Sequence, residues 1–178
     1  MQALDVLILL DADAQSDLSA SLVRRIEEMV RTKQHAMGTV ELSRKDIPPC
    51  TGCLRCLTAH PGSCAYKACF DGIAEQASSC PVIIFLTSAP FGTFSSAVKN
   101  VIDRGALVIR NRGRCRQVII GYGEDATDEE RATFIDVTVK HRGGADIVHP
   151  GVNETFEVYF ARSQKDGEEI SAALAGAL

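Results

Sequence analysis

The sequence lacks any apolar run that approaches the ~20 residues of a membrane-spanning helix, although 46% of its 178 residues are hydrophobic. It also lacks an excess of basic residues, since 19 Lys and Arg stand against 23 Asp and Glu and the net charge is -4 at pH 7. No basic stretch is interleaved with aromatic residues, as a nucleic-acid surface requires. We therefore expect neither a membrane nor a nucleic acid as a partner.

The motifs of hydrolytic and ATP-driven enzymes are absent as well. The sequence contains no H-E-x-x-H, no Walker phosphate loop and no G-x-G-x-x-G, and Gly121-Tyr122-Gly123 is too short to count as the last of these. If the protein is an enzyme, we expect a bound cofactor to carry the chemistry and the protein to supply position and electrostatics.

The first thirteen residues, MQALDVLILLDAD, lack the features of a signal peptide. No basic flank precedes the short apolar run, and Asp5, Asp11 and Asp13 lie around it. We therefore expect a cytoplasmic protein. Thiols stay reduced in that compartment, so the seven cysteines favour metal binding or redox chemistry over disulfides.

Short apolar runs alternate with segments of helical periodicity along the chain. The predicted strands are residues 4–10, 39–42, 82–87 and 118–122, followed by 156–161 alone or as an interrupted pair with 147–149. The predicted helices are 18–30, 73–77, 97–106, a segment from the T-x-x-E capping box of Thr127 and Glu130 to Gly143-Gly144, and 164–178. This alternation predicts an α/β fold with a doubly wound parallel sheet, in a single domain over residues 1–178.

Ligands of a doubly wound sheet bind outside the carboxyl ends of the strands. The loops that follow the first, third and fourth predicted strands are residues 11–19, 88–96 and 121–127. A cysteine-rich loop at 47–70 follows the second strand. We expect all four loops to lie at the same edge of the sheet.

Two stretches of this chain resemble a known family. PPCTGCLRCLTAHPGSCAYK begins at Pro48, and VIIFLTSAPFGTFSSAVKNVIDR begins at Val82. Together they resemble the NADPH-dependent FMN reductase family, including its iron-sulfur flavoprotein branch. The second stretch carries the family's aromatic-Gly, Ser-Ser and Ile-Asp-Arg features as Phe91-Gly92, Ser95-Ser96 and Ile102-Asp103-Arg104. The match is specific over residues 47–104.

The resemblance implies a five-stranded, flavodoxin-like fold with FMN at the ends of strands one, three and four, and a homodimer or homotetramer that completes the flavin site. It implies an oxidoreductase that takes electrons from a reduced nicotinamide nucleotide or an iron-sulfur donor and passes them to a small acceptor such as a quinone or free flavin. No catalytic acid or base is implied. The implied cofactor-binding residues are Ser16 and Ser19 at the phosphate, Ser88, Ala89, Pro90, Phe91, Gly92 and Ser95 along the isoalloxazine, and Gly121 and Gly123 at its other edge.

The chain departs from this family in the loop that should hold the phosphate. Family members usually have a Gly-Ser-Pro-Arg type loop there, whereas this chain has Asp11, Asp13 and Asp17. Each like-charge contact opposes phosphate binding by about 1 kcal/mol when solvated and by several when buried. After strand three, residues 87–91 read Thr-Ser-Ala-Pro-Phe in place of the family's Thr-Pro-x-Tyr. A rival hypothesis is therefore a flavodoxin-like protein that has lost FMN and acts as a binding or assembly module.

Four cysteines of the loop, Cys50, Cys53, Cys56 and Cys64, are spaced C-x2-C-x2-C-x7-C. Three cysteines at this spacing can surround a cubane, and a fourth from farther along completes the set, so the residues are candidates for a [4Fe-4S] cluster of the kind that the iron-sulfur branch carries. Zinc or a redox thiol is an alternative, although zinc sites normally use two separated pairs. An unmetallated loop with small buried cysteines is another. A cluster without flavin would define an electron-transfer protein.

Overall fold

The structure is a computed structural model that describes residues 4–61, 63–66, 70–105, 115–148 and 156–176, with the side chains of residue 71 and residues 141–148 excepted. Five strands form one sheet in the order β2-β1-β3-β4-β5, and every neighbouring pair is parallel. The strands are β1 Val6–Asp11, β2 Met37–Leu42, β3 Val82–Ser88, β4 Arg116–Tyr122 and β5 Phe156–Ala161. This strand order is the flavodoxin-like one, and it confirms the predicted doubly wound sheet.

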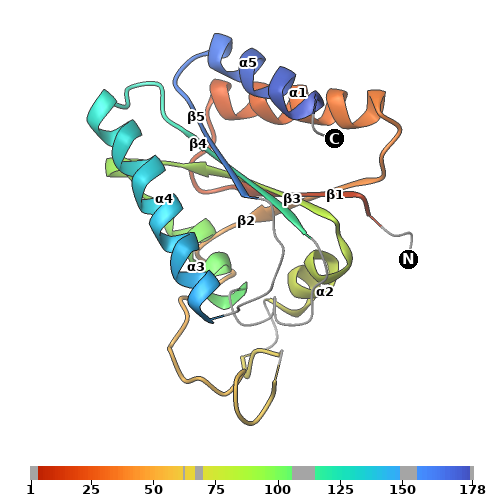
Figure 1. Cartoon of the computed structure of the whole chain (residues 1–178), viewed down its shortest axis with the longest axis vertical. Helices are drawn as coiled ribbons and strands as arrows, with labels where there is room; N and C mark the ends of the chain where they lie inside the picture. The colour runs from red at the N-terminus through yellow and green to blue at the C-terminus, as the bar shows by residue number, and fades with distance from the viewer. Residues whose placement is uncertain (1–3, 62, 67–69, 106–114, 149–155, 177–178) are drawn as a thin grey trace.

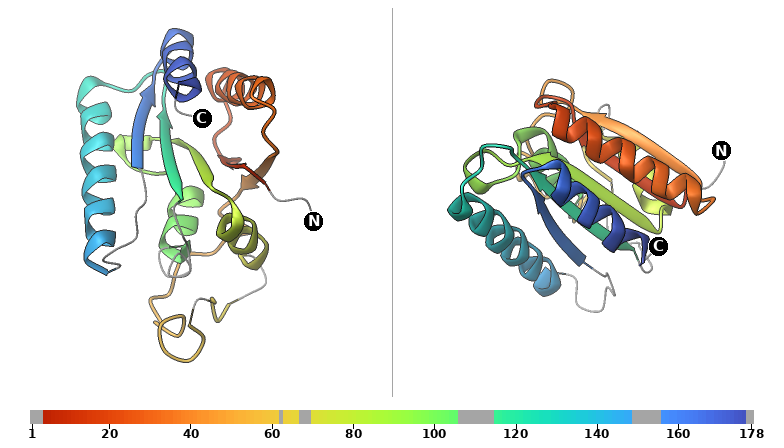
Figure 2. Two further views of the ribbon diagram at one scale, coloured as in Figure 1. Left: turned by 45° about the vertical axis from the view of Figure 1, so that its right-hand side comes forward. Right: turned by 90° about the horizontal axis from the view of Figure 1, so that it is seen from above.

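Helices cover both faces of the sheet. The helices α1 Asp17–Thr32 and α5 Gln164–Ala175 lie side by side over one face (Figure 1). The other face carries α2 Asp71–Ser79, α3 Ser96–Gly105 and α4 Asp128–Val148, and two further views separate the two layers (Figure 2). No helix in the described parts of the chain is long and apolar enough to cross a bilayer.

The strand β1 is almost continuously apolar because both of its faces are buried. Leu7 and Leu9 pack into the core beneath α2, α3 and α4, whereas Val6, Ile8 and Leu10 pack into the core beneath α1 and α5. All five side chains are at most 8% exposed. Burying each contributes about 1.5–3 kcal/mol, which an alternating polar pattern could not supply.

Two predicted boundaries differ from the structure. The helix α4 continues through Gly143 and Gly144 to Val148, so the predicted stop at the glycines is wrong. A glycine inside a helix costs about 1 kcal/mol but does not forbid helical dihedral angles. The fifth strand is residues 156–161 alone; Ile147 and Val148 belong to α4, and His149 lies outside the described residues.

The predicted capping box is confirmed, because Glu130 N donates to Thr127 Oγ1 at 3.1 Å and Thr127 N donates to Glu130 Oε2 at 2.8 Å.

Gly121, the next-to-last residue of β4, is a packing residue. A Cβ there would lie 2.7 Å from a Phe134 ring carbon and 2.9 Å from one of Phe160. These two rings are themselves in edge-to-face contact, with centroids 5.4 Å apart. Neither ring has free space beside it, so glycine is the residue that fits.

We expect Gly121→Ala to lower the free energy of unfolding by about 1–3 kcal/mol, the usual cost of overpacking a core. Urea denaturation measures it. Gly72→Ala is the matched control, because a Cβ at Gly72 in α2 meets nothing within 4 Å. That control should be neutral or slightly stabilising. Equal stability of the two variants would contradict the tight packing described for Gly121.

Candidate functional site

The turn that follows β3 exposes an aromatic ring at the carboxyl edge of the sheet. Phe91, in the short 3-10 helix η2 Pro90–Gly92, has a left-handed φ of 54° and is 86% exposed. A bulky residue in this region stores about 1–3 kcal/mol of strain, which is typical of ligand-binding turns. The ring therefore offers a flat apolar surface that nothing in the described part of the chain covers.

Gly92 explains how this turn is held. Its φ is +70°, and a Cβ at this position would lie 2.6 Å from the carbonyl oxygen of Glu130 and 2.8 Å from Thr133 Cβ. The backbone of η2 thus packs directly against the first turns of α4. The turn therefore cannot move closer to α4.

A buried carboxylate closes the end of β1. Asp11 is 0% exposed. Ser88 donates to it from Oγ at 2.6 Å and from N at 3.2 Å, and Asp13 N donates to it at 3.0 Å. The carboxylate joins the ends of β1 and β3, so Asp11 stabilises the fold and does not face a ligand.

The second carboxylate of this loop faces the loop after β2. Asp13 accepts from Ser43 Oγ and from Arg44 N, both at 2.9 Å. The backbone hydrogen bond from Arg44 is the main cause that lowers the pKa of Asp13, and the Ser43 hydroxyl and the Arg44 charge add to it. The third acid that the sequence places near the phosphate is Asp17, which is exposed in the first turn of α1.

The predicted phosphate serines cap α1. Ser16 is the N-cap residue, and its Oγ accepts from Ser19 N at 3.2 Å while Ser19 Oγ accepts from Ser16 N at 2.8 Å. Tyr122, at the end of β4, donates from its hydroxyl to Ala14 O at 2.8 Å and so fixes the same loop. Burial, and then the charge of Asp11, raises the pKa of Tyr122. The neutral phenol is therefore the form that holds the loop.

The other predicted flavin residues lie around the same edge. Ser95 caps α3, since its Oγ accepts from Val98 N at 3.3 Å. Ala89 is buried and donates from N to Tyr122 O at 3.1 Å, whereas Pro90 is exposed. Gly123 follows β4 and is partly exposed, while Gly121 is buried. The structure brings all of them to one edge, but the open surface belongs to Pro90, Phe91 and Gly123.

This edge fits a flavin at its ring end, where the ring of Phe91 is exposed. At the phosphate end, the carboxylates of Asp11 and Asp13 are bound by protein donors, so they oppose a phosphate less than their sequence positions suggest. The N-terminus of the 16-residue helix α1 lies at the same loop and favours an anion. The negative charge of Asp17 is then the main group that opposes phosphate binding.

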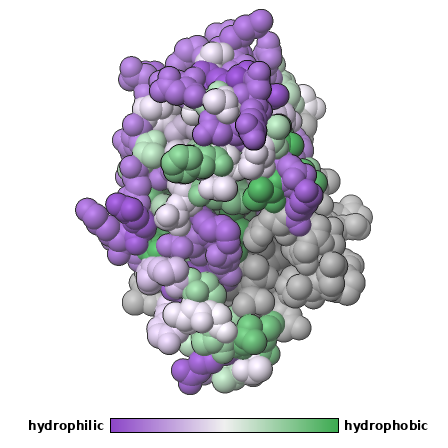
Figure 3. All heavy atoms as spheres, turned by 90° about the vertical axis from the view of Figure 1, so that its left-hand side faces the viewer, coloured by the Kyte–Doolittle hydropathy of each residue, from purple (hydrophilic) through white to green (hydrophobic). Residues whose placement is uncertain are grey.

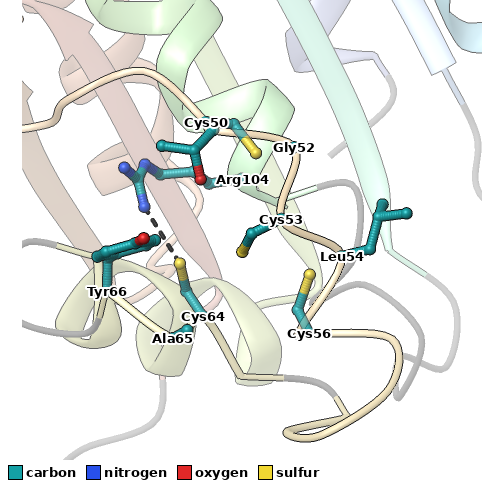
Figure 4. Close-up of a pocket in the computed structure, with 10 residues that line it drawn as sticks. Cys50, Gly52, Cys53, Leu54, Cys56, Cys64, Ala65, Tyr66 and Arg104 are labelled. Atoms are coloured by element: carbon teal, nitrogen blue, oxygen red, sulfur yellow. Dashed lines mark hydrogen bonds between the residues drawn. The ribbon is translucent and has the colours of Figure 1, made fainter.

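The four cysteines of the loop surround one cavity of about 100 Å³, which Thr51, Leu54, Tyr66 and Arg104 also line. Figure 4 shows the sulfurs of Cys50, Cys53, Cys56 and Cys64 turned toward the same space. The described structure therefore brings together the four residues that the spacing selects.

The thiols influence one another electrostatically. Partial burial raises the pKa of Cys56, and the neighbouring sulfurs of Cys50, Cys53 and Cys64 raise it further. A backbone hydrogen bond from Arg55 is the main cause that lowers the pKa of Cys53. Negative charge on the neighbouring sulfurs therefore opposes ionisation of Cys56.

Four cysteines at one cavity are a donor set for iron or zinc. Among the described side chains, no three His, Cys, Asp or Glu residues are arranged to hold a single metal ion. Four cysteine thiolates are the donor set of a [4Fe-4S] cluster, in which each thiolate binds a different iron. The cavity brings such a set together.

The cysteine cage lies farther from the flavin edge than the sequence suggests. The loop runs beside α3, with Asn100 Nδ2 donating to Ile47 O at 2.7 Å and Arg104 Nε donating to Pro48 O at 2.8 Å. Since Arg104 is eight residues after Ser96, the cage is about 12 Å along α3 from the start of that helix. Figures 1 and 2 show the loop beyond the far end of α3.

The sequence analysis did not assign a role to Asn100 or Arg104. Both are polar residues on the buried face of α3, at 8% and 5% exposure, among Ala97, Val98 and Val101. Their spacing could have identified them in the sequence, because two polar residues four apart lie on the same, otherwise apolar, face of a helix.

Fold and site together define a flavodoxin-like α/β protein with a cysteine cage next to the last turn of α3. The model of the NADPH-dependent FMN reductase family matches residues 5–150. The chain belongs to this family.

One curated relative shares part of the sequence, and solved structures share the fold. An iron-sulfur flavoprotein of Archaeoglobus fulgidus is 30% identical over 95 residues, which are 53% of this chain and 46% of that protein, so the match spans about half of that relative. The NAD(P)H:quinone oxidoreductase of Methanothermobacter marburgensis has a similar fold, with a TM-score of 0.62, 15% identity and coverage of 98% of this chain and 94% of that one. An azoreductase of Bacillus anthracis gives a TM-score of 0.61 at 11% identity, covering 97% and 99% of the two chains.

Proposed function

We propose that this protein is an FMN-dependent oxidoreductase. It takes electrons from a reduced nicotinamide nucleotide or an iron-sulfur donor and passes them to a small acceptor such as a quinone or free flavin. The family assignment supports FMN, and a solved structure of similar fold is named a quinone oxidoreductase. FMN, when bound, supplies the electron-carrying ring.

The observation that carries this proposal is the strained, exposed ring of Phe91 at the carboxyl edge of the sheet. Phe91 and Pro90 flank the isoalloxazine in this proposal, and Ser88 and Gly123 border it. The N-terminus of α1, which Ser16 and Ser19 organise, faces the phosphate. These residues bind and orient the cofactor and exclude water from one side of it.

We propose further that Cys50, Cys53, Cys56 and Cys64 hold a [4Fe-4S] cluster. The shared cavity supports this, and the Archaeoglobus fulgidus relative is named an iron-sulfur flavoprotein. The cluster would store or relay one electron at a time, which complements a two-electron flavin.

The protein is also proposed to be a single cytoplasmic domain that works as a homodimer or homotetramer. The surface around α4 is largely hydrophilic in its upper part and carries separate hydrophobic patches below (Figure 3). Val137 and Val139 are among the exposed apolar side chains of this helix. Analytical ultracentrifugation with and without FMN tests the oligomeric state.

The electron donor is tested by stopped-flow absorbance. FMN-loaded protein is mixed anaerobically with NADH, with NADPH, or with a reduced ferredoxin-type protein. We expect loss of absorbance near about 450 nm with at least one of these donors, and its return when a quinone is added. Flavin that none of the three reduces would contradict the proposed function.

We expect Asp17→Asn to tighten FMN binding about fivefold, because removing one solvated like charge is worth about 1 kcal/mol. The same change should lower the free energy of unfolding by about 0.3–1 kcal/mol, because Asp17 stabilises the N-terminus of α1. Quenching of FMN fluorescence measures the affinity. Glu28→Gln, the same charge change about 16 Å farther along α1, is the control and should leave affinity unchanged. Unaltered affinity in Asp17→Asn would place the phosphate elsewhere.

A further inference from the structure

Arg104 connects the two ends of the cysteine loop. It lies in the last turn of α3 and is 5% exposed. Its Nε donates to Pro48 O at 2.8 Å and its Nη2 to Pro49 O at 3.1 Å, both before the first cysteine. Its Nη1 donates to Cys64 Sγ at 3.1 Å, at the last cysteine, as the dashed line in Figure 4 shows. One planar guanidinium therefore fixes both legs of the loop.

Asn100 holds only one of these legs. It lies one helical turn before Arg104 and donates from Nδ2 to Ile47 O at 2.7 Å. Arg104 differs from it in two ways, since it carries a charge and it contacts a sulfur. Substitutions of Asn100 and Arg104 can therefore distinguish the effect of holding the loop backbone from the effect of contacting a cysteine sulfur.

The charge of Arg104 calls for a negative group nearby. Among the side chains that the structure describes, no carboxylate forms an ion pair with it; its partners are two neutral carbonyls and the Cys64 sulfur. A buried cation is costly unless negative charge lies close to it. Four thiolates around a cluster supply negative charge next to this guanidinium.

We propose that Arg104 is a positioning residue that sets Cys64 in place for the cluster and, through its hydrogen bond to the sulfur, makes the bound cluster easier to reduce. This inference rests on the cluster proposed above. Reduction adds one electron, and so one negative charge, to a site that already holds four thiolates, and no bond forms or breaks. A cationic donor stabilises the more negative, reduced state and so raises the reduction potential.

The test uses the full-length protein, reconstituted anaerobically with ferrous iron and sulfide. The variants are Arg104→Gln, Arg104→Lys and the matched control Asn100→Ala, which loosens the loop without touching a sulfur. Bound iron is measured after desalting. The midpoint potential is measured by redox titration of the absorbance near about 400 nm, a readout that does not depend on activity or on flavin.

We expect Arg104→Gln to retain several-fold less iron and to shift the potential to a more negative value. Arg104→Lys, which keeps the charge but not the planar fork, should lie between it and the wild type. Asn100→Ala should keep the wild-type potential. If Arg104→Gln holds no cluster at all, the potential of Arg104→Lys is the deciding measurement. A midpoint potential more negative than that of the wild type then supports the inference.

A wild-type potential in the Arg104 variants overturns the inference, and so does a shift of the same size in Asn100→Ala. Both results would leave the cluster itself in place. Wild-type protein that binds no iron after reconstitution is a different result, because it overturns the proposed cluster and this inference with it.

Discussion

Asp11→Ala is expected to lower the free energy of unfolding by about 2–4 kcal/mol. The change leaves three donors without their buried acceptor, namely Ser88 N, Ser88 Oγ and Asp13 N. Hydrogen bonds to charged groups are worth about 1.5–3 kcal/mol each, and partial rearrangement of the loop recovers some of that cost. Chemical denaturation at neutral pH measures the change.

Asp13→Ala is the matched control, because it removes the same charge two residues away. Asp13 is exposed and bonded to Ser43 and Arg44, so its loss should cost no more than about 1 kcal/mol. The pKa of Asp13 is lowered in the folded protein. Its contribution is therefore present above the ordinary carboxyl pKa near about 3.9 and disappears as the pH falls through the folded pKa. An Asp11 variant as stable as the Asp13 variant would contradict the internal role of Asp11.

Phe91→Gly is expected to weaken FMN binding by roughly 5- to 150-fold, the loss of one aromatic stacking contact of about 1–3 kcal/mol. Stability should change little. Glycine relieves the left-handed strain at φ 54°, and this gain offsets the larger entropy of the unfolded glycine chain. The side chain is 86% exposed, so almost no buried surface is lost.

Phe91→Tyr keeps the ring and serves as the control for this experiment. It should bind FMN about as tightly as the wild type. Fluorescence titration gives the affinities, and thermal unfolding gives the stabilities. If Phe91→Gly binds FMN as tightly as Phe91→Tyr, the ring does not contact the flavin and the proposed site is wrong.

The strands were predictable because burial on both faces imposes a simple pattern. β1 and β3 carry continuous apolar runs, and both lie within one or two residues of the predicted ranges. The end of α4 was not predictable from Gly143 and Gly144, because a glycine costs a helix only about 1 kcal/mol and tertiary context can override that preference. The residues near Gly143 and Gly144 in the sequence do not reveal this tertiary context.

The candidate site was predictable in position but not in detail. Parallel strands bring their following loops to one edge, so residues 88–92 and 121–123 could be placed together from sequence. The directions of the Asp11 and Asp13 carboxylates depend on Ser88 and Ser43, which are 77 and 30 residues away in sequence. The cysteine cage depends likewise on Arg104, which is 40 residues from Cys64.

The absorption spectrum of anaerobically purified protein, before and after FMN is added and the sample is desalted, tests the proposed flavin chemistry most directly. We predict bands near about 375 and 450 nm that survive desalting, with a shoulder near about 400 nm from the cysteine cage that dithionite bleaches. Protein that releases all added FMN would contradict the proposed oxidoreductase. A bleachable shoulder without the flavin bands would then indicate an electron-transfer protein, and a colourless protein would favour the binding or assembly module.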